Sequence, residues 1–384
     1  MKSAQAAESA RIEDYLFRKL LPLWAERGWD HARGGFHDQL EVDRSPTPLP
    51  YRRLTALGRQ LFVFSEAARL TAEDRFAAIA HASYDYLLRR FWDERYGGWY
   101  FKVDLSGAAL DSGKDLYGHA FALFGLAHYY SAFRRQEALE RARETNRLLK
   151  RHLLLPAGWF ASKGARDWRP VGGELNQNPH MHLLEAYLAL EAASGDAAFR
   201  LDANAVVALL HRRLFDEESG TLGEFFDESG LPHPEKGNEL EPGHFFEWYW
   251  LLREGAALWT DPRARATAER LFDWAERRGV DAERGGVYDL LDRGGRVLRD
   301  SKRIWPQAER IKAHAIKLRS GGAEEERARL ATLVAFLFDN YLLADGGWRE
   351  SLARQLTPSA TPLPATTPYH IFLALREALK AFAA

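Results

Sequence analysis

A short glycine-aromatic motif recurs six times along this chain of 384 residues and limits the folds open to it. Its last glycines lie at positions 35, 98, 158, 223, 286 and 347, so successive copies are 63, 60, 65, 63 and 61 residues apart. Spacing this regular is typical of repeat proteins, in which each unit is one supersecondary element. The copies read Gly34-Gly35-Phe36-His37-Asp38, Gly97-Gly98-Trp99-Tyr100, Gly158-Trp159-Phe160, Gly223-Glu224-Phe225-Phe226-Asp227, Gly285-Gly286-Val287-Tyr288-Asp289 and Gly346-Gly347-Trp348-Arg349-Glu350.

Between the motifs, apolar residues recur with the 3.6-residue period of amphipathic helices. Twelve helices are predicted, two per repeat, and each motif supplies a stop and a short β-like turn after an odd-numbered helix. An open solenoid usually has polar capping repeats, but the last helix here is as apolar as the middle ones. We therefore predict an all-α (α/α)6 toroid of six helical hairpins, with the even helices forming the inner ring. The predicted helices cover 8–27, 52–70, 73–92, 115–133, 136–154, 179–194, 198–215, 242–258, 262–279, 305–319, 324–343 and 368–382.

The composition narrows the class of protein further. A chain of this length exceeds the roughly 250–300 residues that one ordinary core serves, so it forms either two domains or one closed repeat; we expect a single catalytic domain over 1–384. The 53 basic and 54 acidic residues nearly cancel without long runs of either sign, which argues against nucleic-acid or membrane partners. The absence of cysteine and of an apolar leader favours a cytoplasmic protein. A neutral small molecule is the expected substrate.

Four even helices begin with proline in the first turn, where its missing N–H costs nothing. Each also carries a histidine or carboxylate within about one turn of the helix start. A lone histidine at such a place is usually structural, but its recurrence at equivalent positions of a closed ring predicts one histidine-based site. A helix N-terminus disfavours imidazolium, so these histidines are expected to stay neutral and act as bases. The four starts read Asn178-Pro179-His180-Met181-His182, Glu241-Pro242-Gly243-His244, Trp305-Pro306-Gln307-Ala308-Glu309 and Thr367-Pro368-Tyr369-His370.

A metal site is the main alternative reading of these histidines. His180 and His182 are about 200° apart on a helix and cannot share an ion. His244 and Glu247 share a face and are better read as an imidazole oriented by a carboxylate. Because no metal-ligand spacing or phosphate-binding loop is present, we expect neither metal nor cofactor.

The residues Lys114, Tyr117 and His119 stand at the start of another even helix. They are candidates for the pocket wall. A purely structural role is equally open for them.

Five motifs in order resemble the N-acylglucosamine 2-epimerase superfamily, which includes cellobiose 2-epimerases and mannose and sulfoquinovose-type aldose–ketose isomerases. The resemblance covers essentially the whole chain and implies an (α/α)6 barrel. The motifs are Gly58-Arg59-Gln60-Leu61-Phe62-Val63-Phe64-Ser65-Glu66, Asn178-Pro179-His180-Met181-His182-Leu183-Leu184-Glu185-Ala186, Pro242-Gly243-His244-Phe245-Phe246-Glu247-Trp248-Tyr249-Trp250-Leu251-Leu252, Trp305-Pro306-Gln307-Ala308-Glu309 and Tyr369-His370.

The resemblance implies a role for each matching residue. His370 matches the general base that removes the C2 proton of an open-chain aldose, and His244 matches the second catalytic histidine, which assists ring opening and is steered by Glu247. Arg59 matches the arginine that polarises the O1/O2 side of the sugar. Asn178 and His182 match residues that contact sugar hydroxyls. Trp305 matches the pocket wall and Glu309 its orienting carboxylate, while His180 is expected to be structural.

The residues of the second motif and of the segment from Pro364 to Ile371 resemble those of the mannose-isomerase branch of the superfamily. The implied activity is interconversion of D-mannose and D-fructose, with lyxose/xylulose as a further pair, by a monomer or homodimer. The first alternative is a 2-epimerase acting on mannose/glucose, cellobiose-type disaccharides or N-acylglucosamine, since both histidines are present. A glycoside hydrolase would need two carboxylates across the bond, whereas the inward candidates are mainly histidines. A non-catalytic sugar-binding protein also stays open.

Overall fold

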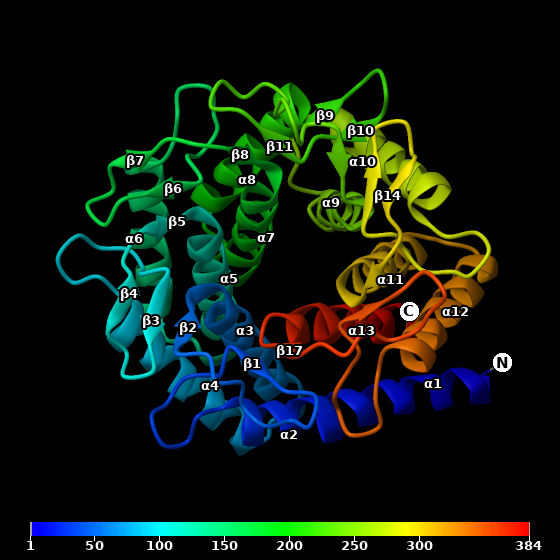
Figure 1. Cartoon of the computed structure of the whole chain (residues 1–384), viewed down its shortest axis with the longest axis horizontal. Coiled ribbons are helices and arrows are strands. Elements are labelled where there is room, and N and C mark those ends of the chain that lie inside the picture. The colour runs from blue at the N-terminus through cyan, green and yellow to red at the C-terminus, as the bar shows by residue number, and fades with distance from the viewer. Residues whose placement is uncertain (1, 384) are drawn as a thin grey trace.

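Two concentric rings of helices form the molecule in the computed structural model, which describes residues 2–383 (Figure 1). The inner ring consists of α3 (Leu54–Thr71), α5 (Leu116–Phe133), α7 (Gln177–Ser194), α9 (Pro242–Glu254), α11 (Ile304–Arg319) and α13 (Thr367–Ala383). Each inner helix contacts the next, and α13 contacts α3, so the ring is closed. The predicted toroid with the even helices inside is confirmed, and the open solenoid is wrong.

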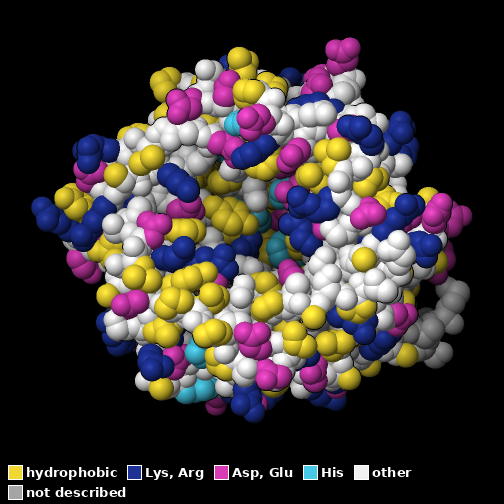
Figure 2. Space-filling model, viewed as in Figure 1, with side chains coloured by type: hydrophobic (Ala, Val, Ile, Leu, Met, Phe, Trp, Pro, Cys, Tyr) yellow, Lys and Arg dark blue, Asp and Glu magenta, His cyan; other side chains and the backbone are white. Residues whose placement is uncertain are grey.

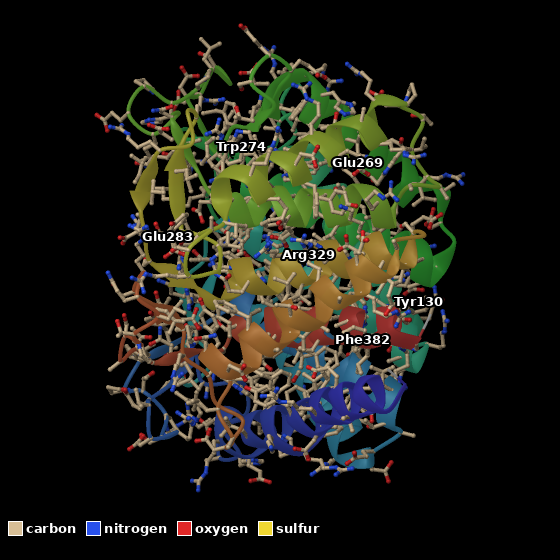
Figure 3. The ribbon with its side chains drawn as sticks, turned by 90° about the vertical axis from the view of Figure 1, so that its right-hand side faces the viewer. Tyr130, Glu269, Trp274, Glu283, Arg329 and Phe382 are labelled. Carbon is tan, nitrogen blue, oxygen red and sulfur yellow. The ribbon has the colours of Figure 1, made fainter. Side chains whose placement is uncertain are left out.

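The outer ring holds the other member of each hairpin, and four of its six helices end in a π-helical turn. In the side view, α10, α12 and the N-terminal helix follow one another down the outer wall (Figure 3). All twelve predicted helices are present with ends within four residues, except that the first begins at Lys2. The outer elements are α1 (Lys2–Tyr15) continued by η1 (Leu16–Leu20), α2 (Leu21–Leu23) and η2 (Trp24–Gly28); α4 (Asp74–Tyr86) with η3 (Leu87–Phe91); α6 (Gln136–His152); α8 (Ala197–Leu209) with η4 (Leu210–Leu214); α10 (Arg263–Trp274) with η5 (Ala275–Gly279); and α12 (Glu324–Asn340).

Short antiparallel sheets of two or three strands lie where the chain enters the inner helices. Strand β1 pairs with β17, which ties the first repeat to the last. The other pairings are β2–β3–β4, β5–β6–β7, β8–β11, β9–β10, β12–β13–β14 and β15–β16. The bounds are β1 (Gln39–Leu40), β2 (Tyr51–Arg53), β3 (Lys102–Asp104), β4 (Ala109–Asp111), β5 (Lys114–Asp115), β6 (Lys163–Gly164), β7 (Pro170–Val171), β8 (Leu175–Asn176), β9 (Phe215–Asp216), β10 (Thr221–Leu222), β11 (Phe225–Phe226), β12 (Glu239–Leu240), β13 (Leu290–Asp292), β14 (Val297–Arg299), β15 (Lys302–Arg303), β16 (Ser351–Leu352) and β17 (Leu363–Pro364).

The glycines of the motif form the tight turn expected of them. In the second repeat, Gly97 and Gly98 have φ of +70° and +71°, a region that favours glycine. A Cβ on Gly98 would also lie 2.3 Å from the ring of Trp168. The turn brings Trp92 and Trp99 together as a single β-bridge. The predicted β-like turn is therefore confirmed, and glycine is required there for both conformation and space.

Buried ion pairs join three of these turns to the inner ring. An aspartate just after the outer helix pairs with a basic residue two positions before the inner helix. The pairs are Asp30–Arg52 at 2.7 Å, Asp93–Lys114 at 3.0 Å and Asp281–Lys302 at 2.8 Å. Lys114 is thus a structural cation and is not part of the wall of the central cavity.

Two of the histidines near helix starts are also structural. His119 Nε2 accepts the backbone N–H of Trp99 at 3.0 Å, and His180 Nε2 accepts that of Phe160 at 2.9 Å. The Nδ1 of each ring lies within 2.9 Å of a backbone carbonyl oxygen four residues earlier. Both rings therefore anchor the motif turn to an inner helix, as expected for His180.

Replacing Lys302 with methionine is expected to lower the free energy of unfolding by about 3–5 kcal/mol, because Asp281 would keep a buried charge without its main partner. Urea denaturation of both proteins would measure the difference. The matched control is Lys236→Met, which breaks a surface pair with Glu174 at 2.7 Å and should cost less than about 1 kcal/mol. Equal losses in the two variants would contradict the structural role of the buried pair.

Candidate active site

One cavity of about 340 Å³ opens at the N-terminal ends of the inner helices, and all six helices contribute to its wall. Figure 2 shows it as a hollow at the centre of the ring, with histidine and charged side chains inside. The starts of all six inner helices therefore share one cavity. Eight of the nine residues predicted for the site line this cavity: Arg59, Tyr117, Asn178, His182, His244, Glu247, Trp305 and His370.

The ninth residue, Glu309, lies directly behind His370. Its Oε1 is 2.8 Å from His370 Nδ1, so the imidazole is held by a carboxylate and presents its other nitrogen. Burial lowers the pKa of His370 to about 4, against the opposing charge of Glu309. At neutral pH His370 is therefore an unprotonated imidazole with a fixed orientation, which is the state that a general base requires.

The carboxylate that orients His244 is Glu224, and the prediction of Glu247 was wrong. Glu224 Oε2 lies 2.9 Å from His244 Nδ1. Residues three apart on a helix share a face, but here Glu247 points to the pocket floor while Glu224 arrives from the preceding motif turn. The sequence contained a signal for this partner, because Glu224 is an acidic residue inside the repeated motif.

The ionisation of His244 also differs from the expectation of neutral histidines. Burial favours the neutral ring, but the charge and hydrogen bond of Glu224, with smaller contributions from Glu241 and Glu247, outweigh burial and raise the pKa of His244 to about 9. The helix start does not override a carboxylate at hydrogen-bond distance. The cavity therefore contains one neutral and one protonated imidazole at pH 7, and both rings pack against Trp305 with centroids 5.9 Å and 4.9 Å away.

A third histidine-carboxylate pair lies deeper, between α7 and α13. His182 Nδ1 is 3.0 Å from Glu185 Oε2, and the hydroxyl of Tyr369 donates to the other oxygen of Glu185. Burial lowers the pKa of His182 to about 4. This pair holds the imidazole rigid at the cavity wall, in a position suited to hydrogen bonding with a polar ligand.

Arg59 supplies positive charge to the cavity. Its Nη2 donates to the hydroxyl of Tyr117 at 2.7 Å, and its guanidinium stacks 3.7 Å from the ring centroid of Phe121. Its Nε is buried and has no hydrogen-bond partner within residues 2–383. Arg59 is thus held by aromatic side chains and keeps donor capacity for a ligand oxygen.

His182, Glu185 and Glu247 are the side chains of the described chain whose ligand atoms come within 4.8 Å of one another, as a shared metal ion would need. The His182 nitrogen is already engaged by Glu185, however, and the ammonium of Lys312 lies 4.0 Å from Glu247 Oε1. His182 is thus already held by Glu185, and Lys312 supplies positive charge beside Glu247, so the arrangement fits a network of internal contacts better than a metal site.

The acidic residues of the repeated motif are the functional feature that sequence reasoning passed over. Asp38 holds Arg53 and Asp289 holds Arg303, both at the cavity mouth. Glu350 Oε2 accepts the hydroxyl of Thr367 at 2.9 Å, and burial raises the pKa of Glu350 to about 7. The motif acids thus position residues at the start of the inner helices, and Glu350 also lines the cavity.

Comparison with known proteins agrees with this geometry. The family model of N-acylglucosamine 2-epimerase matches residues 34–374. A mannose-6-phosphate isomerase of Rhizobium meliloti is 33% identical over 96% of both chains, and a cellobiose 2-epimerase of Dictyoglomus turgidum is 27% identical over 94% of this chain and 95% of its own. The crystal structure of a D-mannose isomerase superposes with a TM-score of 0.88 at 23% identity over 97% of both chains, which supports the fold. The chain belongs to the N-acylglucosamine 2-epimerase family of sugar epimerases and isomerases.

Proposed function

We propose that the protein is an aldose–ketose isomerase that interconverts D-mannose and D-fructose through a cis-enediol intermediate. The observation that carries this proposal is a pair of imidazoles in different protonation states. His370 is neutral and His244 is protonated, and the two rings share one cavity and pack on the same indole ring. Removal of a proton next to a carbonyl needs a positioned base and stabilisation of the developing oxyanion. His370 and Arg59 supply these two requirements.

The mechanism assigns each step to a side chain. His244 donates a proton to the ring oxygen of the bound sugar, which opens to the aldehyde as the C1 hydroxyl proton passes to water, and His244 then regains a proton from water. His370 Nε2 then takes the C2 proton while Arg59 stabilises the negative charge on the enediolate oxygens. His370 returns that proton to C1, and the O2 proton passes to O1, so the aldose becomes a ketose with no change in atoms or electrons.

The electrostatics of the mouth favour a neutral sugar. Arg53 lies 2.6 Å from Asp38, and Arg303 lies 2.8 Å from Glu241 and 3.1 Å from Asp289. These arginines are already neutralised and have little charge left for a phosphate group. Because one relative has the name mannose-6-phosphate isomerase, the phosphorylated sugar is the informative comparison substrate, and we expect a lower kcat/KM for it than for mannose.

Epimerisation at C2 is the second candidate. His244 and His370 share the cavity, and two acid/base groups that flank C2 could remove a proton from one face and return it to the other. A relative named cellobiose 2-epimerase aligns with nearly the whole chain. The two reactions share the first proton transfer and differ only in where the proton returns.

Incubation of the protein with D-mannose in deuterated water distinguishes these outcomes. Fructose as the first product supports the isomerase, whereas glucose carrying deuterium at C2 supports the epimerase. Binding without exchange at C2 would overturn both and leave a sugar-binding protein.

The pH profile of kcat/KM is expected to be a bell between about pH 4 and about pH 9. Activity falls below the acid limit because His370, with a pKa of about 4, gains a proton and ceases to be a base. Activity falls above the alkaline limit because His244, with a pKa of about 9, loses the proton that it donates. In Glu224→Gln the alkaline limb should move at least one unit lower, since the charge that holds this proton is gone. An unchanged limb in that variant would contradict the assignment of His244 as the acid.

Exhaustive treatment with a chelator is expected to leave turnover intact. The charge stabiliser in the mechanism is Arg59, and the buried carboxylate of Glu309 is paired with Lys312. Assays before and after chelation, followed by addition of divalent ions, would measure this. Loss of activity that a divalent ion restores would contradict the mechanism.

A further inference from the structure

A fully buried lysine lies behind the cavity and has no part in the mechanism described so far. Lys312 stands on α11 one turn after Glu309, and its Nζ is 2.7 Å from Glu309 Oε2. The ammonium also lies 4.0 Å from the ring centroid of Trp250. Burial of a lysine is costly unless the charge is compensated, and Lys312 does not line the cavity, so its function must be sought through its partner.

That partner is the carboxylate that orients the base. Glu309 uses Oε2 toward Lys312 and Oε1 toward His370 Nδ1, at 2.7 Å and 2.8 Å. The three side chains therefore form a continuous chain of contacts from a buried cation to the cavity. An ionised Glu309 can only accept, so it fixes the Nδ1–H of His370 toward itself, whereas a protonated Glu309 has an O–H that can donate to Nδ1 instead.

A neighbouring glutamate shows what happens to a buried carboxyl without such close compensation. Glu247 is as deeply buried as Glu309, but its nearest oxygen is 4.0 Å from Lys312 Nζ. Burial and the negative charge of Glu309 raise the pKa of Glu247 well above its usual range. Burial works in the same direction on Glu309, yet the charge of Lys312 and the contact with His370 together outweigh it, and the pKa of Glu309 is lowered.

We propose that Lys312 is a positioning residue for the reaction: its ammonium keeps Glu309 ionised, so that Glu309 holds the Nδ1–H tautomer of His370 and leaves Nε2 free as the base. This inference rests on the proposed function of His370. Without Lys312, a protonated Glu309 would donate its own proton to Nδ1. The ring proton would then sit on Nε2, facing the substrate, and the base would be lost.

Other charged groups surround Glu309 and enter its pH dependence. Glu247 from α9 and Tyr369 and His370 from α13 interact with Glu309 itself. Four further groups act on its neighbours: Glu185 from α7 on Lys312, His182 from α7 and Arg59 from α3 on His370, and His244 from α9 on Glu247. Burial and neighbouring carboxylates raise the pKa values of Tyr369 and Glu247 well above their usual ranges and so favour their uncharged forms, while Glu185 is held by His182 and Tyr369. Lys312 is the cation in direct contact with Glu309 within the described chain.

The test is the pH profile of Lys312→Met with mannose as substrate. At pH 7 we expect kcat to fall about 10–100-fold, as when an outer orienting partner is lost, with KM changed less than about threefold because the sugar contacts stay. The acid limb should move from about pH 4 toward neutrality. Activity should partly recover at higher pH, because rising pH ionises Glu309 again and restores the tautomer.

Three matched variants separate positioning from stability. Lys312→Arg keeps the charge and should keep the acid limb near its wild-type place. Lys302→Met removes an equally buried lysine that pairs with Asp281 in a motif turn and should lower the melting temperature without moving the limb. In the Glu309→Gln background, Lys312→Met should add little, because the two residues act through one contact.

An acid limb that stays near pH 4 in Lys312→Met, with only a lower melting temperature, would overturn the proposal. Should that variant not fold, the ¹⁵N spectrum of His370 in the wild-type protein decides, with His370→Asn to assign the signal. The Nδ1–H tautomer at pH 5–8 supports the proposal, and the Nε2–H tautomer refutes it. This spectrum does not depend on turnover, so it still judges Lys312 if mannose shows no exchange at C2 and the proposed function fails.

Discussion

The variant His370→Asn is expected to abolish both turnover and proton exchange at C2 while the fold survives. His370 presents its free nitrogen to the cavity, and Glu309 holds the ring from behind. Loss of a general base typically costs about 10²–10⁴ in rate. Asparagine keeps a polar side chain of similar reach, and in the first turn of α13 it changes helix propensity little. Deuterium incorporation from solvent would measure the exchange at C2, and circular dichroism would show whether the fold survives.

The control for this variant is His180→Asn, another buried histidine in the first turn of an inner helix. His180 binds the backbone of the motif turn, so its loss should lower the melting temperature and spare most of kcat. If His370→Asn kept more than about a tenth of wild-type activity, an effect too small for a lost base, the base would lie elsewhere and His244 would be the next candidate.

The second large effect concerns His244→Asn. Turnover of mannose should fall about 10²–10⁴-fold, because ring opening loses its proton donor. D-glyceraldehyde is too short to close a stable sugar ring and does not need this step. Exchange of its C2 proton should therefore persist in the variant, since His370 and Arg59 remain in place.

The ratio of the two activities is the decisive readout for His244. Wild-type protein should handle both substrates, and His244→Asn should lose mannose turnover far more than glyceraldehyde exchange. Glu224→Gln serves as the milder companion, because it keeps the ring but removes the charge that raises its pKa. Equal loss on both substrates would show that His244 takes part in the C2 proton transfer itself.

The sequence predicted more of the fold than of the site chemistry. The six motif copies and the 3.6-residue period located every helix and the closed ring, because both signals are local and repeat with the architecture. Proline and histidine at the helix starts located the cavity wall for the same reason. His119 stayed undecided until the structure showed its bond to the backbone of Trp99.

Residue spacing in the sequence could not identify which side chains of different elements contact one another. Helical periodicity placed His244 and Glu247 on one face, but the carboxylate that binds His244 is Glu224, 20 residues earlier in a turn. Helical periodicity also gave no reason to single out Lys312 among the residues of its inner helix. Its role becomes visible only in the structure, where its ammonium lies beside Glu309.

The sequence by itself thus determined the closed double ring and the set of polar side chains at its mouth, since hydrophobic period and turn chemistry act over a few residues. Only the tertiary structure decided which carboxylate meets which histidine, and therefore which imidazole is charged. The reason is that a pKa depends on burial and on charges within a few ångströms. In a ring of helices those neighbours come from different repeats.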